Sequence, residues 1–238
     1  MILKYIRLTI TAFLIAIFAT LWGIICIARP AHPGNTFIIA RVFGLIGRYI
    51  LGLKVEIENL ELLEKTRGSV IISNHQSNFD MFYVGVICPR KTVSVGKKSL
   101  LYIPFFGLMY WLSGNILIDR GNRRKAWSVM DKVVDTIKKY NCNIWIMPEG
   151  TRSKGRGVLP FKKGAFVTAI KGGFEILPIA VSSFDKWVDF TKFNSGTVKL
   201  KVLQPLKSEG YTMDSLNELK DQAYKIISDE VLKLDQSY

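Results

Sequence analysis

A histidine and an aspartate five residues apart are the side chains in this sequence best suited to acid–base chemistry. They are His75 and Asp80, in the segment NHQSNFD at 74–80, which follows an apolar run at 70–72. Five residues turn an α-helix by about 500°, so the two side chains cannot share a helix face. They can meet only if His75 lies on a loop and Asp80 in the first turn of the next helix. Asp80 would then hold one ring nitrogen of His75, and the other nitrogen would accept a proton.

A purely structural interpretation of this segment is also open. Ser77-x-x-Asp80 resembles a capping box, so Asp80 could serve only as a helix cap, and His75 could be a buried structural histidine. The sequence has no Gly-x-Ser-x-Gly nucleophile elbow, and no cysteine is near either residue. If the pair is catalytic, a hydroxyl of the substrate is therefore the expected nucleophile. The only other histidine is His32, and we predict no metal site.

Polar clusters also follow two other predicted strands. DRGNRRK at 119–125 follows a strand at 115–119, and PEGTRSKGRG at 148–157 follows one at 143–147. Because α/β sheets place ligand sites at strand ends, we expect the clusters to converge at one edge of the sheet. A plain turn at 148–157 and a solvated basic helix start at 123–125 are the structural alternatives.

The arginine and the glycine of PEGTRS suit the binding of a phosphate. Arg152 can hold phosphate oxygens in a bidentate contact, and Gly150 lets the backbone come close to a ligand. Arg120 and one of the two lysines Lys97 and Lys98 would add positive charge to this pocket. The phosphate is that of the substrate which the family resemblance described next implies.

In order and spacing, these segments resemble the glycerolipid acyltransferases, specifically the 1-acyl-glycerol-3-phosphate acyltransferase family. The resemblance covers roughly residues 70–182 and includes the intervening segment 98–107. Its four blocks are Asn74–Asp80, Gly114–Arg120, Met147–Ser153 and Ile176–Ala180. Met147 stands where the family usually has phenylalanine. A single His-x4-Asp match is weak, whereas four blocks in this order are specific.

The resemblance implies a reaction and a set of roles. His75, held by Asp80, would deprotonate the 2-hydroxyl of a lysophosphatidate, and this hydroxyl would attack a long-chain acyl thioester to give phosphatidic acid. The donor would be acyl-CoA or an acyl carrier protein, with no cofactor and no acyl-enzyme. Glu149, Gly150 and Thr151 would share the glycerol-phosphate pocket with Arg152.

Alternation of strand-like and helical patterns beyond residue 55 predicts an α/β layered domain. With the resemblance, the expected fold is a glycerolipid-acyltransferase-like domain with a mixed or mostly parallel central sheet flanked by helices. The predicted strands are 69–73, 92–95, 115–119, 143–147, 176–182 and 197–203. The predicted helices are 79–88, 99–112, 123–140, 163–172 and 212–234. The apolar stretch at 100–112 is expected to be core, with part of an acyl channel as the alternative.

Two apolar segments precede this domain. Leu8–Ala28 carries no charge and can cross a hydrocarbon core about 30 Å thick. Thr36–Leu53 has two arginines, Arg41 and Arg48, on one helical face, as in a helix lying at a membrane interface. We therefore predict a membrane-embedded helical hairpin at 1–53 and an acyltransferase domain at 54–238. A single span followed by a core helix, or a cleaved signal peptide, are the alternatives.

The composition narrows the partners and the compartment. The net charge is +14, with 49% hydrophobic residues and a mean hydropathy of +0.20, which favours anionic lipid headgroups or phosphorylated substrates as partners. The sequence lacks the basic–aromatic interleaving and the helix-turn-helix pattern of nucleic-acid-binding proteins, so we expect no nucleic-acid partner. Three widely spaced cysteines indicate no disulfide framework. The expected location is the cytoplasmic face of the inner cell membrane.

Two rival functions remain at this point. The first is an acyltransferase of the same family that takes another acceptor, either glycerol-3-phosphate or a lysophospholipid with a larger head. The second is a non-enzymatic membrane module that binds anionic lipid through its positive charge. A change of His75 to alanine separates them, because a pure binder would keep its affinity for lipid.

Overall fold

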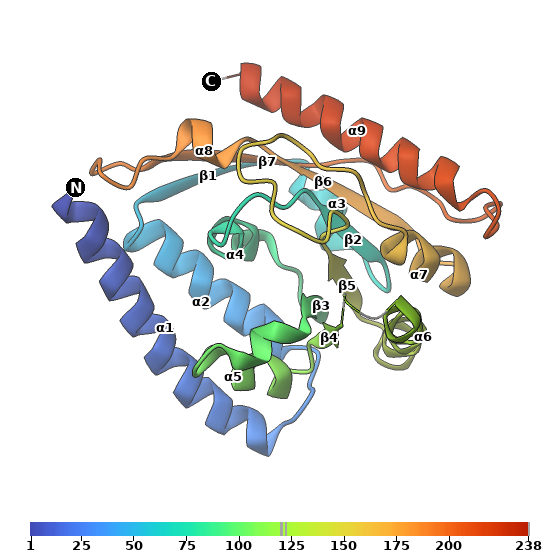
Figure 1. Ribbon diagram of the computed structural model, residues 1–238, viewed down its shortest axis with the longest axis horizontal. Coiled ribbons are helices and arrows are strands. Elements are labelled where there is room, and N and C mark those ends of the chain that lie inside the picture. The colour runs from blue at the N-terminus through green and yellow to red at the C-terminus, as the bar shows by residue number, and fades with distance from the viewer. Residues whose placement is uncertain (120, 122, 238) are drawn as a thin grey trace.

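The computed structural model describes residues 1–119, 121 and 123–237, and a seven-stranded sheet forms its centre (Figure 1). The strand order is β1-β7-β6-β2-β5-β3-β4, and all neighbouring strands are parallel except β6 and β7. The strands are β1 (Leu53–Glu58), β2 (Val70–Ser73), β3 (Thr92–Lys97), β4 (Ile116–Ile118), β5 (Asn143–Ile146), β6 (Ile176–Val181) and β7 (Gly196–Val202). The predicted mixed, mostly parallel sheet is confirmed.

Helices cover both faces of this sheet (Figure 1). The helices are α1 (Ile2–Ala28), α2 (Asn35–Tyr49), α3 (Leu60–Lys65), α4 (Asp80–Val84), η1 (Gly85–Ile87), η2 (Lys98–Tyr102), α5 (Phe106–Leu112), α6 (Arg123–Tyr140), α7 (Gly164–Gly172), α8 (Phe184–Trp187) and α9 (Leu216–Gln236). One hydrophobic cluster joins α1, α2, α4 and α5 to one sheet face, and another joins α6, α7 and α9 to the other. The central strands β2, β5 and β6 are buried throughout, as a covered parallel sheet requires.

The predicted elements need three corrections. Strand β1 and the short helices α3 and α8 were not predicted, although the burial of β1 alternates with the period of two that marks a strand. The predicted helix at 79–88 divides into α4 and η1. The predicted helix at 99–112 divides into η2 and α5, because Pro104 has no N–H to continue it.

Helices α1 and α2 form an N-terminal hairpin closed by a turn at 29–34 (Figure 1). Of the described helices, α1 alone is long and apolar enough to cross a membrane, which makes it the candidate membrane anchor. Helix α2 packs on α4, and a Cβ added at Gly47 would lie 2.8 Å from the Cβ of Phe82. Arg41 is exposed and donates to the carbonyl of Val86 at 2.9 Å. The division into 1–53 and 54–238 stays a prediction.

Candidate active site

Two loops that leave neighbouring parallel strands lie together at one edge of the sheet. The loop after β2 carries His75, and the loop after β5 carries the PEGTRS segment. The N–H of Ser153 donates to the carbonyl of His75 at 2.8 Å, and the N–H of Lys154 donates to that of Gln76 at 3.1 Å. The first and third polar clusters therefore converge as the sequence predicts, because β2 and β5 run side by side in the same direction.

His75 and Asp80 are in direct contact. Nδ1 of His75 lies 2.6 Å from Oδ2 of Asp80, with His75 on the loop and Asp80 as the first residue of α4. Since an ionised carboxylate only accepts, Nδ1 carries the proton of this bond and Nε2 of the neutral ring is unprotonated. The side chain of His75 is 22% exposed and that of Asp80 only 3%. The pair thus has the geometry of an oriented base, and the catalytic roles remain predictions.

Asp80 also holds the loop that precedes its helix, so a structural role and a catalytic role of this carboxylate are compatible. Oδ2 accepts the N–H of Gln76 at 2.8 Å, while Oδ1 accepts the N–H of Ser77 at 2.8 Å and the hydroxyl of Tyr83. These bonds stabilise a buried carboxylate. Burial and the charge of Asp80 raise the pKa of Tyr83 well above its usual value, so Tyr83 stays a neutral donor.

Asn74 and Gln76 fix the same loop to the end of β6. The side-chain amide of Asn74 exchanges two bonds of 2.9 Å with the backbone of Val181. The amide of Gln76 donates to the carbonyl of Ser182 at 2.7 Å and accepts the N–H of Phe184 at 2.8 Å. Sequence reasoning assigned no role to these two residues. Their partners lie over 100 positions away, so only the resemblance to a fixed motif marks them.

Glu149 is buried against the loop that carries His75, with 2% of its surface exposed. Its Oε1 accepts the backbone N–H of His75 at 2.6 Å, and its Oε2 accepts that of Leu159 at 3.0 Å. Burial raises the pKa of Glu149 to about 7, while the two N–H donors oppose that rise. The observed contacts of this carboxylate are therefore with two backbone N–H groups, those of His75 and Leu159.

Gly150, Thr151 and Arg152 of the same segment lie nearer the surface. Arg152 donates to the side-chain oxygen of Asn78, which links the two loops, and Thr151 is exposed. Gly150 has φ +66°, and a Cβ there would lie 2.9 Å from Cδ of Lys162. The turn therefore needs glycine, and Lys162 lies over its α-carbon. Lys162 was missed by the sequence analysis, because the loop path that returns it to Gly150 is not readable from local pattern.

The other basic residues predicted for the phosphate site are Lys97, Lys98 and Arg120. Lys97 ends β3 and Lys98 begins η2, and both are exposed. Lys97 shares a strand face with Val95, which lines a neighbouring cavity. Arg120 lies outside the described residues.

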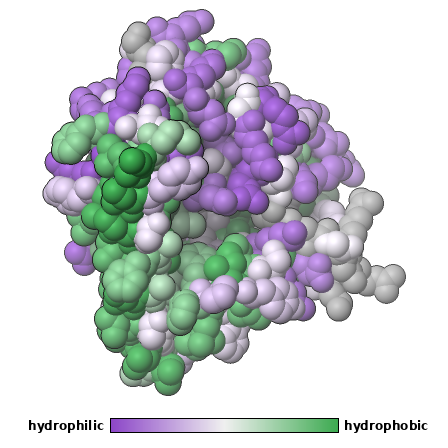
Figure 2. All heavy atoms as spheres, turned by 60° about the vertical axis from the view of Figure 1, so that its left-hand side comes forward, coloured by the Kyte–Doolittle hydropathy of each residue, from purple (hydrophilic) through white to green (hydrophobic). Residues whose placement is uncertain are grey.

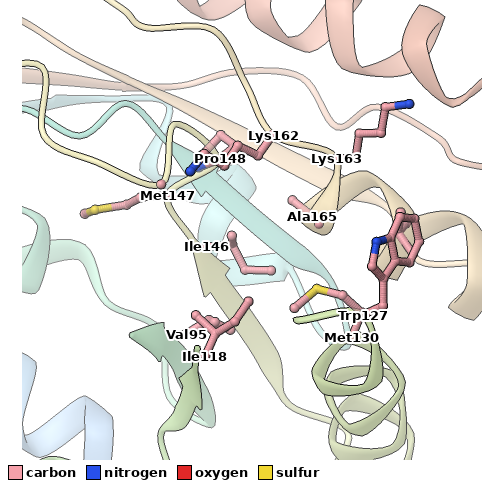
Figure 3. Close-up of a pocket in the computed structure, with 13 residues that line it drawn as sticks. Val95, Ile118, Trp127, Met130, Ile146, Met147, Pro148, Lys162, Lys163 and Ala165 are labelled. Carbon is pink, nitrogen blue, oxygen red and sulfur yellow. The ribbon is translucent and has the colours of Figure 1, made fainter. Parts of the chain in front are cut away.

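A cavity of about 510 Å³ adjoins the PEGTRS turn (Figure 3). Its wall is mainly apolar and comes from β3, β4, β5, α6 and α7, with Ile118, Met130 and Ile146 among the lining residues. Gly150 and Lys162 belong to the same wall, and the side chain of Lys163 points away from the cavity in Figure 3. An apolar chamber thus lies beside a basic, polar loop, which suits a ligand with an apolar chain and a charged head.

A layered α/β sheet with a His-x4-Asp pair beside a basic loop defines an acyltransferase-type site. The acyltransferase family model matches residues 54–182, and the chain belongs to this family. The 1-acyl-sn-glycerol-3-phosphate acyltransferase of Escherichia coli is 40% identical, over 97% of this chain and 94% of that protein. The one of Haemophilus influenzae is 37% identical, over 99% and 96%, and the human alpha enzyme is 34% identical, over 83% and 70%.

A solved structure has the same fold. The 1-acyl-sn-glycerophosphate acyltransferase of Thermotoga maritima superposes with a TM-score of 0.76, at 20% identity, over 97% of this chain and 95% of that one. The predicted acyltransferase fold is therefore confirmed over the sheet, the flanking helices and the N-terminal hairpin.

Proposed function

We propose that this enzyme transfers a long-chain acyl group from a thioester to the 2-hydroxyl of 1-acyl-glycerol-3-phosphate, giving phosphatidic acid. Nε2 of His75 takes the hydroxyl proton as the oxygen attacks the thioester carbonyl. The C–S bond breaks as the tetrahedral intermediate collapses, and the departing thiolate takes up the proton from the imidazolium. Asp80 keeps Nδ1 protonated and stabilises the positive ring between these two transfers.

One observation carries this proposal: the 2.6 Å contact of His75 with a buried, multiply hydrogen-bonded Asp80. Such a carboxylate fixes the tautomer in which Nε2 is the base. The names of the relatives support the acceptor, since those in bacteria, human and yeast are all 1-acyl-sn-glycerol-3-phosphate acyltransferases.

The cysteines give no support to a covalent acyl-enzyme. Cys26, Cys88 and Cys142 are all buried, and burial raises the pKa of Cys88 to about 12 and that of Cys142 to about 11. A thiol with so high a pKa is almost entirely protonated near neutral pH and is a poor nucleophile. The hydroxyls nearest to His75 in sequence are those of Ser73 and Ser77. Oγ of Ser73 accepts the indole N–H of Trp145 at 3.0 Å. Oγ of Ser77 donates to Asp80 at 3.2 Å and accepts the N–H of Phe79 at 3.0 Å.

For the acceptor phosphate we propose Arg152, together with Lys162, which lies over Gly150, and Lys97 near the same edge of the sheet. The described bond to Asn78 uses one of the five N–H donors of Arg152, so a bidentate contact with phosphate stays possible. The apolar cavity next to Gly150 is the proposed place for an acyl chain. A panel of acceptors tests this assignment: lysophosphatidate should be used far better than glycerol-3-phosphate or lysophosphatidylcholine. Equal use of all three would remove the phosphate from the specificity.

Acyl-CoA and an acyl carrier protein are the two candidate acyl donors. Purified enzyme given each thioester with the same acyl chain and saturating lysophosphatidate would separate the two donors through their kcat/KM values.

We further propose that α1 lies within one leaflet instead of crossing the bilayer. A helix of this length spans about 40 Å. Near its start, Arg7 donates to Ser195 at 2.8 Å and to the carbonyl of Lys192 at 2.6 Å. Near its end, Sγ of Cys26 lies 3.5 Å from Oγ of Ser113. Both ends therefore contact the same domain, which a helix crossing to the far side could not do.

Sealed vesicles test this placement of α1. An epitope tag at Met1 should be digested by protease from the same side as the catalytic domain. Protection of the tag would show that α1 crosses the bilayer. The cytoplasmic side of the inner membrane remains the expected location of that domain.

A further inference from the structure

The segment η2–α5 exposes large apolar and aromatic side chains along its outer face. Tyr102, Ile103, Phe105, Leu108 and Trp111 are each between 46% and 77% exposed. The inner face of α5 is packed, with Phe106 stacked on Phe43 at 6.1 Å and Met109 fully buried. A helix that is apolar all round suits a wholly apolar environment, yet no described part of the chain covers this outer face.

The backbone holds one of these side chains outward. Phe105 has φ +62° and ψ −53°, and the N–H of Phe106 donates to the carbonyl of Pro104 at 2.6 Å. This is a classic γ-turn, which non-glycine residues rarely adopt. Phe105 is 59% exposed at the tip of this turn. The fold therefore maintains a strained conformation whose visible effect is to present an aromatic ring away from the protein.

This outer face is continuous with α1, the candidate membrane anchor. The carbonyl of Leu112 accepts the N–H of Ala31 at 2.9 Å, and Ser113 contacts Cys26. Helix α1 itself exposes Phe13, Leu21 and other large apolar residues along its length. Figure 2 shows apolar residues gathered along the left and lower part of this face, with hydrophilic residues above them and to the right.

The charges around the segment match an anionic partner. No acidic residue occurs between Asp80 and Asp119, and Lys97 and Lys98 directly precede the exposed apolar face. Tyrosine and tryptophan are also the residues enriched where a bilayer meets water. We propose that η2–α5 inserts into the headgroup region of an anionic phospholipid leaflet, as a membrane-binding element additional to α1. The inference requires membrane association, and it is independent of the acceptor and of the His75 mechanism.

Fluorescent labels on single introduced cysteines test this placement. We suggest Phe105→Cys and Leu108→Cys in the full chain, with Leu232→Cys as the matched control, because Leu232 is 61% exposed on α9. The buried native cysteines should label poorly, and unsubstituted protein measures that background. Each nitrobenzoxadiazole-labelled protein is bound to vesicles of phosphatidylglycerol and phosphatidylethanolamine that contain a lipid nitroxide.

Labels at 105 and 108 should shift to the blue and be quenched by the lipid nitroxide, whereas the label at 232 should not change. Equal, unquenched emission at all three positions on vesicle-bound protein would overturn the proposal. A blue shift that grows with protein concentration and without vesicles would also overturn it, because the face would then contact a second copy of the chain.

An activity measurement gives an independent readout. Phe105→Ser should lower the fraction of enzyme bound to dilute anionic vesicles about ten- to a hundredfold, the effect of losing one buried aromatic side chain. Turnover of a short-chain acceptor in detergent should stay close to that of the unsubstituted protein. Unchanged vesicle binding of Phe105→Ser would contradict the insertion of this residue. Because the detergent assay reports the chemistry separately, a failure of the proposed function would appear there and would leave the binding result intact.

Discussion

The carboxylate of Glu149 accepts the backbone N–H of His75 at 2.6 Å, across 74 positions of sequence. Its second oxygen accepts the N–H of Leu159. Glu149 thereby joins the loop that carries His75 to the loop that carries Arg152. This contact favours a positioning role over the direct substrate contact that the family resemblance implies.

Glu149→Gln should lower kcat about a hundredfold, because glutamine has one acceptor oxygen for two N–H groups and a displaced base loses productive geometry. The KM for lysophosphatidate should change little. Steady-state kinetics with varied acceptor checks this expectation. A raised KM with unchanged kcat would instead make Glu149 a substrate ligand.

The raised pKa of Glu149 also predicts a pH dependence of stability. Its pKa is about 7 in the folded protein, against 4.5 for the ordinary carboxyl. Between these values the folded state binds more protons than the unfolded state, so this residue lowers the free energy of unfolding as the pH rises from about 4.5 to 7. Denaturant unfolding at pH 5 and pH 8 should show this loss. Glu149→Gln should reduce the difference, and an identical difference in both proteins would refute the assignment.

Asp80→Asn should lower kcat by about 10²–10⁴-fold, since asparagine cannot hold the tautomer that leaves Nε2 free. Tyr83→Phe is the matched control. It removes one donor to Asp80 and should cost about 1.5–3 kcal/mol of stability, the usual value for a bond to a charged group, with a far smaller loss of kcat. Similar losses of kcat in both variants would mean that Asp80 acts mainly as a structural cap.

Arg152→Ala should weaken use of a phosphorylated acceptor about 10–150-fold, the range expected for a charge-assisted contact. Arg152→Lys should restore only part of this, because an ammonium is a point charge. Arg156→Ala is the control, since Nε of Arg156 donates to the carbonyl of Ser153 at 2.8 Å within the same loop. An Arg152→Ala enzyme with full kcat/KM at limiting lysophosphatidate would place the phosphate elsewhere.

Local pattern predicted strands β2 to β7 and a contact of His75 with Asp80, because a strand and a five-residue spacing are both local features of the sequence. Strand β1 escaped notice since it adjoins an apolar helix, and its partner β7 lies at the other end of the chain. The stretch at 100–112 was expected to be core, yet only its inner face is packed. An apolar composition is expected both for a core segment and for a surface that faces a membrane, so the sequence of this stretch could not distinguish the two.

The long-range contacts that hold the loops of the site in place could not be predicted from the sequence. The amides of Asn74 and Gln76 bind the backbone after β6, and Lys162 lies over Gly150. These contacts depend on strand order and loop paths, which no local pattern fixes. A carboxylate in a turn can equally face a ligand or a backbone N–H, so the contacts of Glu149 were visible only in the fold.

The most direct test of the mechanism is the turnover of His75→Ala with lysophosphatidate and an acyl thioester. His32→Ala is the control, because His32 is the only other histidine and its Nδ1 contacts Arg29 at 2.8 Å in the turn after α1. The mechanism predicts that His75→Ala loses about 10²–10⁴-fold or more in kcat while it remains folded, and that His32→Ala keeps its activity. A folded His75→Ala enzyme with half of the original turnover would contradict the mechanism.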